Sequence, residues 1–186
     1  MDIGEFNMIV GIFVDCQEDF VNGVLGTPEA KDIIPYIKKE THSNRYDFMF
    51  FTQDWHDTTI EQSSIESKRV PCHTPAGQHG AVIIQGIIPS EKGNWRIIQK
   101  DTFGTFALPD LIMDESYGYG EPVEEIHIMG VCTDICVISN ALILRSAFPN
   151  IPIYVHANGC VGSSPEAHDA ALKVMTHCCI DILEEV

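Results

Sequence analysis

Short apolar runs that alternate with helical patterns constrain the fold of this chain more than any other feature. Residues 8–14 are apolar throughout and β-branched at four positions, which is typical of a strand buried on both faces. Similar runs predict strands at 48–52, 95–100, 126–131, 151–156 and 180–183, and helical patterns fall at 30–39, 108–113, 136–148 and 165–177. Strands that alternate with helices predict an α/β fold with a parallel sheet covered on both faces.

The composition is that of an ordinary globular protein. A length of 186 residues suits one domain over 1–186, and no apolar run approaches the roughly 18 residues of a membrane span. The N-terminus lacks the basic region of a signal peptide, so we expect a cytoplasmic protein with no membrane partner. A net charge of −16 argues against nucleic acid as a partner, because phosphates would be repelled. Seven irregularly spaced cysteines indicate reduced thiols.

Three reactive side chains follow predicted strands. Cys136 lies where the run 126–131 gives way to a helix, whose free N–H groups stabilise a thiolate and an oxyanion. Asp15 and Lys100 follow two other strands, and the carboxyl ends of parallel strands meet at one edge of a sheet. A carboxylate can take the thiol proton while a lysine stabilises the anions. The alternatives are a buried filler cysteine, a strand-end aspartate and a solvated lysine.

A second group of polar side chains lies in the segment 53–80, which shows no sustained period. It comprises Asp54, His56, Glu66 and His73. Imidazole and carboxylate ligands suit Zn²⁺, Mn²⁺ or Fe²⁺, and four protein ligands leave room for water or substrate. The alternative is that Asp54 and His56 share one side of an extended segment for no functional reason. A segment of this length is functional or disordered in most compact domains.

Five motifs carry a resemblance to a known family. They are residues 15–23 (DCQEDFVNG, against DxQNDFxxG), 52–56 (TQDWH, against TxDWH), 66–73 (ESKRVPCH), 100–106 (KDTFGTF, against KxxYSAF) and 130–137 (GVCTDICV, against GxxTDxCV). From about residue 9 to 182 the chain resembles the nicotinamidase/pyrazinamidase branch of the isochorismatase-like cysteine hydrolases.

The resemblance implies a three-layer αβα, Rossmann-like fold around a doubly wound, six-stranded, mainly parallel sheet. It also implies hydrolysis of nicotinamide, and of pyrazinamide, to the acid and ammonia, as in NAD salvage. In that scheme Asp15 deprotonates Cys136, which forms a thioester, with Lys100 beside them. Backbone N–H groups of Cys132 and Cys136 bind the oxyanion, helped by a cis peptide bond between Val131 and Cys132.

The same resemblance implies one divalent metal ion, zinc first with manganese or iron as alternatives. Asp54, His56, Glu66 and His73 would hold it, and it would accept the pyridine nitrogen of the substrate. Members of this family assemble as homodimers or homotetramers, so we expect one of these states.

The predicted substrate pocket departs from the family pattern. Val70 stands where the family usually has an aromatic residue, and Phe103 replaces a tyrosine. Phe20 and Val131 complete the expected pocket. Two other functions therefore stay open. One is a related cysteine amidohydrolase that acts on another small amide or ureido compound with a vestigial metal set. The other is a non-enzymatic module for binding or oligomerisation.

Overall fold

Six parallel strands form one sheet in a computed structural model that describes residues 7–57, 64–90 and 93–184. The order across the sheet is β3-β2-β1-β4-β5-β6, and every neighbouring pair is parallel. The strands are β1 (Met8–Val14), β2 (Phe48–Asp54), β3 (Trp95–Lys100), β4 (Val123–Val131), β5 (Ile153–Val161) and β6 (Asp181–Leu183). The predicted α/β class and doubly wound sheet are confirmed.

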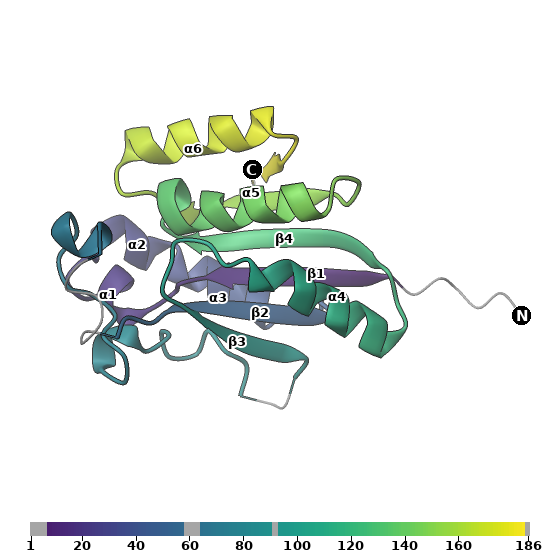
Figure 1. Cartoon of the computed structure of the whole chain (residues 1–186), viewed down its shortest axis with the longest axis horizontal. Helices are drawn as coiled ribbons and strands as arrows, with labels where there is room; N and C mark the ends of the chain where they lie inside the picture. Colours follow the sequence, from purple (N-terminus) through teal and green to yellow (C-terminus); the bar gives the residue numbers. More distant parts are fainter. Residues whose placement is uncertain (1–6, 58–63, 91–92, 185–186) are drawn as a thin grey trace, which may run out of the picture.

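Helices cover both faces of the sheet (Figure 1). They are α1 (Glu18–Val21), α2 (Pro28–Asp32), α3 (Ile34–Thr41), α4 (Ala107–Tyr119), α5 (Ile138–Ala147) and α6 (Pro165–His177), with short helical turns η2 (Glu66–Lys68), η3 (His79–Ala81) and η4 (Thr133–Val137). In Figure 1, α4 and α5 lie in front of the sheet and α2 and α3 lie behind it. None of the helices in the described ranges is long and apolar enough to cross a membrane.

The central strands are apolar because both of their faces are covered. All seven residues of β2 are buried, and β1 is buried at six of its seven positions. Phe13 and Phe51 stack with ring centroids 5.1 Å apart across the β1–β2 pair. These two strands therefore form a rigid support for the residues at their carboxyl ends.

Several predicted boundaries needed correction. The bounds of β1, β3 and α6 agree with the sequence, but the helix expected at 30–39 is two helices, α2 and α3, interrupted at Ile33. Pro35 explains the interruption, because proline has no N–H to donate to the preceding turn. The helix expected at 108–113 is longer, since α4 runs from Ala107 to Tyr119 and is followed by Gly120, whose φ is +72°. Gly120 adopts the left-handed conformation that commonly ends a helix.

The fold brings the carboxyl ends of β1 and β4 together at the centre of the sheet. The chain crosses from β1 toward β2 and β3 on one side, and from β4 toward β5 and β6 on the other. The connections diverge at this point, and α/β proteins bind ligands outside the carboxyl ends of the strands at such a point. Asp15 and Cys136 follow β1 and β4, and Asp54 and Lys100 are the last residues of β2 and β3, so all four belong to this edge.

Candidate active site

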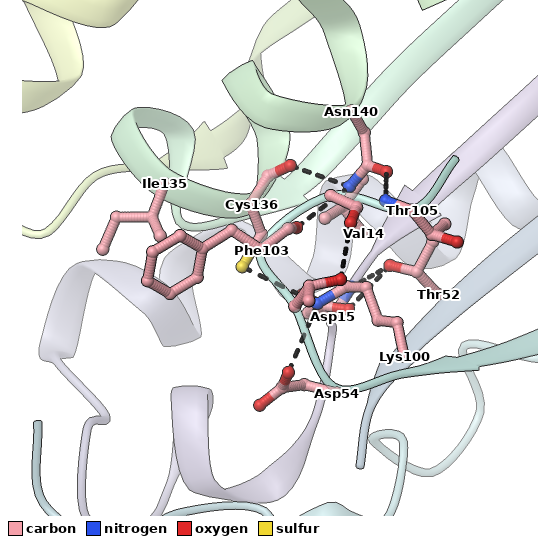
Figure 2. A network of polar contacts seen from close by, with 12 residues as sticks. Val14, Asp15, Thr52, Asp54, Lys100, Phe103, Thr105, Ile135, Cys136 and Asn140 are labelled. Atoms are coloured by element: carbon pink, nitrogen blue, oxygen red, sulfur yellow. Dashed lines mark hydrogen bonds and ion pairs between the residues drawn. The ribbon is translucent and has the colours of Figure 1, made fainter. Parts of the chain in front are cut away.

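Asp15, Lys100 and Cys136 meet at the centre of the sheet edge (Figure 2). Asp15 directly follows β1, Lys100 ends β3, and Cys136 lies in η4 after β4. The helix predicted from residue 136 instead begins at Ile138, because residues 133–137 form a wider, π-helical turn. This turn holds Cys136 between the strand and α5, with its side chain buried.

The three side chains form one contact cluster. Lys100 Nζ lies 2.6 Å from Asp15 Oδ2 and 3.9 Å from Cys136 Sγ. Asp15 is fully buried, and the side chain of Lys100 is 1% exposed. The ammonium therefore lies between a carboxylate and a thiol in a site with little access to water.

Thr52 orients the Asp15 carboxylate. Its hydroxyl donates to Asp15 Oδ1 at 2.6 Å and accepts from the Asp15 backbone N–H at 3.2 Å. Asp15 has a φ of +49°, a conformation uncommon for a residue with a side chain. Thr52 and Lys100 thus hold one oxygen each of a carboxylate that turns back toward the sheet edge.

Burial and charge set the protonation states of the cluster. Burial raises the pKa of Asp15 above its usual value, although the Lys100 ammonium opposes the rise. Burial also raises the pKa of Cys136 well above that of a free thiol; the charge of Asp15 adds to this rise and Lys100 opposes it. Burial alone would lower the pKa of Lys100, but the neighbouring anions raise it overall. Lys100 is therefore charged, and the thiol and the carboxyl can exchange one proton.

Asp54 connects this cluster to the predicted metal ligands. Its Oδ1 lies 3.4 Å from Lys100 Nζ, and its Oδ2 lies 2.8 Å from His56 Nε2 and 3.3 Å from His73 Nε2. Burial alone would raise the pKa of Asp54, but the hydrogen bonds with His56 and His73 outweigh burial and lower it. One carboxylate is thus shared by the lysine and two imidazoles.

Asp54, His56 and His73 fit a metal ion. All three are buried, and one ligand atom from each lies within 4.8 Å of the others. His73 Nδ1 lies 2.8 Å from the carbonyl oxygen of Pro71, which leaves Nε2 facing Asp54. Metal-binding histidines commonly use their second nitrogen in this way. Two imidazoles and a carboxylate suit zinc, manganese or iron.

Glu66 lies at the margin of this set. It is in η2, and its Oε1 lies 3.6 Å from His73 Nε2. It is not among the residues whose ligand atoms all lie within 4.8 Å of one another. Cys72, whose thiol would be a soft ligand next to His73, is exposed and also lies outside the set.

The predicted pocket residues have different surroundings. Phe20 is buried, and its ring centroid lies 5.5 Å from that of His73. Val131 is buried at the end of β4, and its peptide bond to Cys132 is cis, as expected. Val70 is half-buried, and Phe103 is 43% exposed. Phe20 is therefore the aromatic ring that the structure places against the candidate metal ligands.

Four supporting residues escaped the sequence prediction. Gln17 hydrogen-bonds both the N–H and the C=O of Asp54, and Asn140 donates to the carbonyl oxygen of Cys136. Thr52 holds Asp15, as described above, and the hydroxyl of Thr74 donates to Asp54 Oδ2 at 2.7 Å. Gln17 and Thr52 occupy matching positions of the family motifs at 15–23 and 52–56, and Thr52 also lies two residues before Asp54 on one strand face.

Comparisons with known proteins define the class. Residues 10–185 match the Isochorismatase domain, so the chain belongs to the isochorismatase family. It is 28% identical over 173 residues to the uncharacterized isochorismatase family protein PncA of Bacillus subtilis (strain 168), covering 87% of this chain and 91% of the relative.

Solved structures agree with this assignment. The crystal structure of nicotinamidase/pyrazinamidase PncA from Bacillus subtilis has a TM-score of 0.80 and 26% identity, covering 95% of this chain and all of the other. The pyrazinamidase of Pyrococcus horikoshii in complex with zinc has a TM-score of 0.76 and 26% identity, covering 96% and 99% of the two chains. The protein is thus an isochorismatase-family hydrolase whose structural neighbours include nicotinamidases and pyrazinamidases.

Proposed function

We propose that this protein is a metal-dependent cysteine amidohydrolase that converts nicotinamide to nicotinate and ammonia, and that also accepts pyrazinamide. The observation that carries the proposal is the continuity of two groups of side chains through Asp54. The Asp15–Lys100–Cys136 cluster can perform acyl transfer, and the adjoining Asp54–His56–His73 set can hold a cation.

The first half of the reaction forms a thioester. Cys136 Sγ attacks the carboxamide carbon while its proton passes to Asp15. The carbonyl oxygen becomes an oxyanion that accepts hydrogen bonds from the backbone N–H groups of Cys132 and Cys136. Lys100 keeps its proton and stabilises the anionic groups around it, because its charge lies within 3.9 Å of the sulfur.

The second half releases the two products. Asp15 returns the proton to the departing amine, and the C–N bond breaks to give ammonia. Water then attacks the thioester carbon, with Asp15 as the base, and the C–S bond breaks to give the carboxylic acid and the Cys136 thiol. Atoms balance, since one water is consumed for each amide.

The metal ligands act on substrate position. When bound, a divalent cation would supply a Lewis-acid site for the pyridine nitrogen. Asp54, His56 and His73 would hold it, with Glu66 as the outer fourth ligand. Phe20 would pack against the ring, because it already contacts His73.

The composition of the predicted substrate pocket supports an alternative function. Val70 and the exposed Phe103 provide less aromatic surface than a pyridine ring would use for stacking. A related cysteine amidohydrolase of another small amide or ureido compound, with no need for metal, would tolerate this pocket. A non-enzymatic binding or oligomerisation module would use neither Cys136 nor the histidines.

An ammonia-release assay separates these functions. The substrates are nicotinamide, pyrazinamide and an N-carbamoyl compound, tested with the purified protein before and after chelation and after adding back zinc, manganese or iron. We expect turnover of nicotinamide that is lost on chelation and restored by one of these metals. Activity that survives chelation would favour the metal-free amidohydrolase. The absence of ammonia release from every amide would favour the binding module.

Further expectations accompany this function. We propose that residues 1–186 act as one domain, that the enzyme is a cytoplasmic homodimer or homotetramer, and that it serves NAD salvage. Size-exclusion chromatography with light scattering measures the subunit number directly.

A further inference from the structure

Thr74 occupies an unusual position beside the metal ligands. It is fully buried, directly follows His73, and has a φ of +41°. A β-branched residue in this conformation is a genuine outlier. Such a conformation persists only where surrounding contacts hold it.

Three separate connections join Thr74 to the three candidate ligands. Its hydroxyl donates to Asp54 Oδ2 at 2.7 Å. Its carbonyl oxygen accepts the backbone N–H of His56 at 3.1 Å, and the adjacent Pro75 bridges to His56 as a short parallel pair. Its own N–H belongs to the peptide bond with His73. One residue therefore touches the side chain of one ligand and the backbones of the other two.

The hydroxyl bond helps to fix which way the carboxylate of Asp54 faces. A carboxylate offers only acceptor atoms, so the Thr74 hydroxyl must donate. With Oδ2 held by Thr74, Oδ1 is turned toward Lys100 at 3.4 Å. Loss of the hydroxyl would remove the only one of these contacts that comes from neither the lysine nor the imidazoles, so the carboxylate would be held less firmly between them.

Asp19 holds Thr74 in turn. Its Oδ2 accepts the backbone N–H of Thr74 at 2.7 Å. The carboxylate of Asp19 is confined by two glycines, since a Cβ on Gly80 would lie 2.0 Å from Oδ2 and a Cβ on Gly23 would lie 2.4 Å from Oδ1. A helix-borne carboxylate in α1 thereby fixes the loop that carries His73.

We propose that Thr74 is a positioning residue for the metal site: its hydroxyl and its Asp19-held backbone set the orientation of Asp54, His56 and His73. The inference rests on the proposed metal-dependent function and adds to it a residue that touches neither the metal nor the substrate. Hydrogen-bond partners of metal ligands typically contribute 10- to 100-fold in metal affinity.

The test measures metal affinity rather than turnover. Zinc and manganese dissociation constants are determined for the full chain by competition with a chromophoric chelator. Thr74→Val keeps the branched shape but removes the hydroxyl, and we expect about 10- to 100-fold weaker binding. Thr74→Ser restores the hydroxyl and should stay close to the parent. Thr41→Val is the matched control, because Thr41 is a buried threonine in α3 whose hydroxyl bonds the backbone of Lys38.

Each outcome is decisive. Parental affinity in Thr74→Val, or equal weakening in Thr74→Val and Thr41→Val, would overturn the proposal. If Thr74→Val does not fold, Asp19→Ala decides, since it removes the acceptor of the Thr74 N–H and should also weaken binding; parental affinity there overturns the proposal. A parent protein that binds no metal overturns the proposed metal-dependent function itself, which distinguishes the two failures.

Discussion

Two cysteines four residues apart are both buried near Asp15, but only one of them has a lysine beside it. Cys136 Sγ lies 3.9 Å from Lys100 Nζ, whose charge opposes the rise in thiol pKa caused by burial. Burial, together with the charges of Asp134 and Asp15, raises the pKa of Cys132 to about 12. Both thiols are therefore protonated at rest, but only Cys136 has an ammonium beside it that can stabilise the thiolate once its proton has been removed.

The two cysteines should respond differently to the same substitution. Cys136→Ala removes the nucleophile, so kcat for ammonia release should fall by more than about 10³-fold. Cys132→Ala keeps the backbone N–H that would serve the oxyanion and should retain most of the activity. An equally complete loss in Cys132→Ala would contradict this assignment of roles. Thermal unfolding of both variants controls for misfolding.

At the scale of elements, the last residues of β4, just before Cys132, lie very close to the end of β1. Gly130 in β4 has a φ of +137°, and a Cβ there would lie 2.0 Å from the carbonyl oxygen of Val14. Gly120, at the end of α4, also has a positive φ, but a Cβ there would meet no atom within 4 Å. The first glycine is required by space and conformation, and the second by conformation alone.

The same substitution at these two glycines separates the two effects. Gly120→Ala should lower the free energy of unfolding by about 1 to 2 kcal/mol, the cost of a left-handed conformation for an L-residue. Gly130→Ala should cost about 3 kcal/mol or more, because steric overlap adds to the conformational cost. Urea unfolding followed by circular dichroism gives both values. Equal losses would show that the β1–β4 contact relaxes around a methyl group.

At the scale of the whole molecule, a chain of hydrogen bonds joins α3 to the sheet. Tyr36 Oη lies 2.8 Å from His156 Nδ1, and His156 Nε2 lies 2.8 Å from His127 Nδ1. His127 Nε2 lies 3.0 Å from Glu125 Oε2. Burial lowers the pKa of His127, and burial together with the charge of His127 lowers the pKa of His156 to about 3. Both rings are therefore neutral in the folded protein near pH 7.

The two neutral, buried histidines of this hydrogen-bond network predict that the protein loses stability in acid. The unfolded His156 titrates near its usual pKa, so below about pH 6.5 only the unfolded state takes up that proton, and stability falls until about pH 3. The slope is about 1.4 kcal/mol per pH unit for one group. His156→Gln should unfold with a shallower pH dependence than the parent between pH 6 and 4. His177→Gln, at an exposed position in α6, should match the parent slope.

Local patterns determined the class of fold and the main reactive groups. An apolar, β-branched run specified β1 to the residue, because a strand buried on both faces leaves a continuous signal. The bounds of β3 were also predicted to the residue, although β3 is an edge strand that is exposed at three of its six positions. Parallel strands end at one edge, so Asp15, Lys100, Asp54 and Cys136 were expected there, and the structure places them there. The family motifs added the cis bond between Val131 and Cys132.

Tertiary structure decided the lengths of the other strands and the contacts between loops. β5 extends through polar Asn158 to Val161 because pairing with β4 outweighs local preference. The bond from Thr74 to Asp54 and the clamp of Gln17 on Asp54 join segments far apart in the chain. No periodicity marks such pairs, since their geometry exists only after the sheet has formed. The sequence thus determined which groups can act, and the folded chain decided which of them touch.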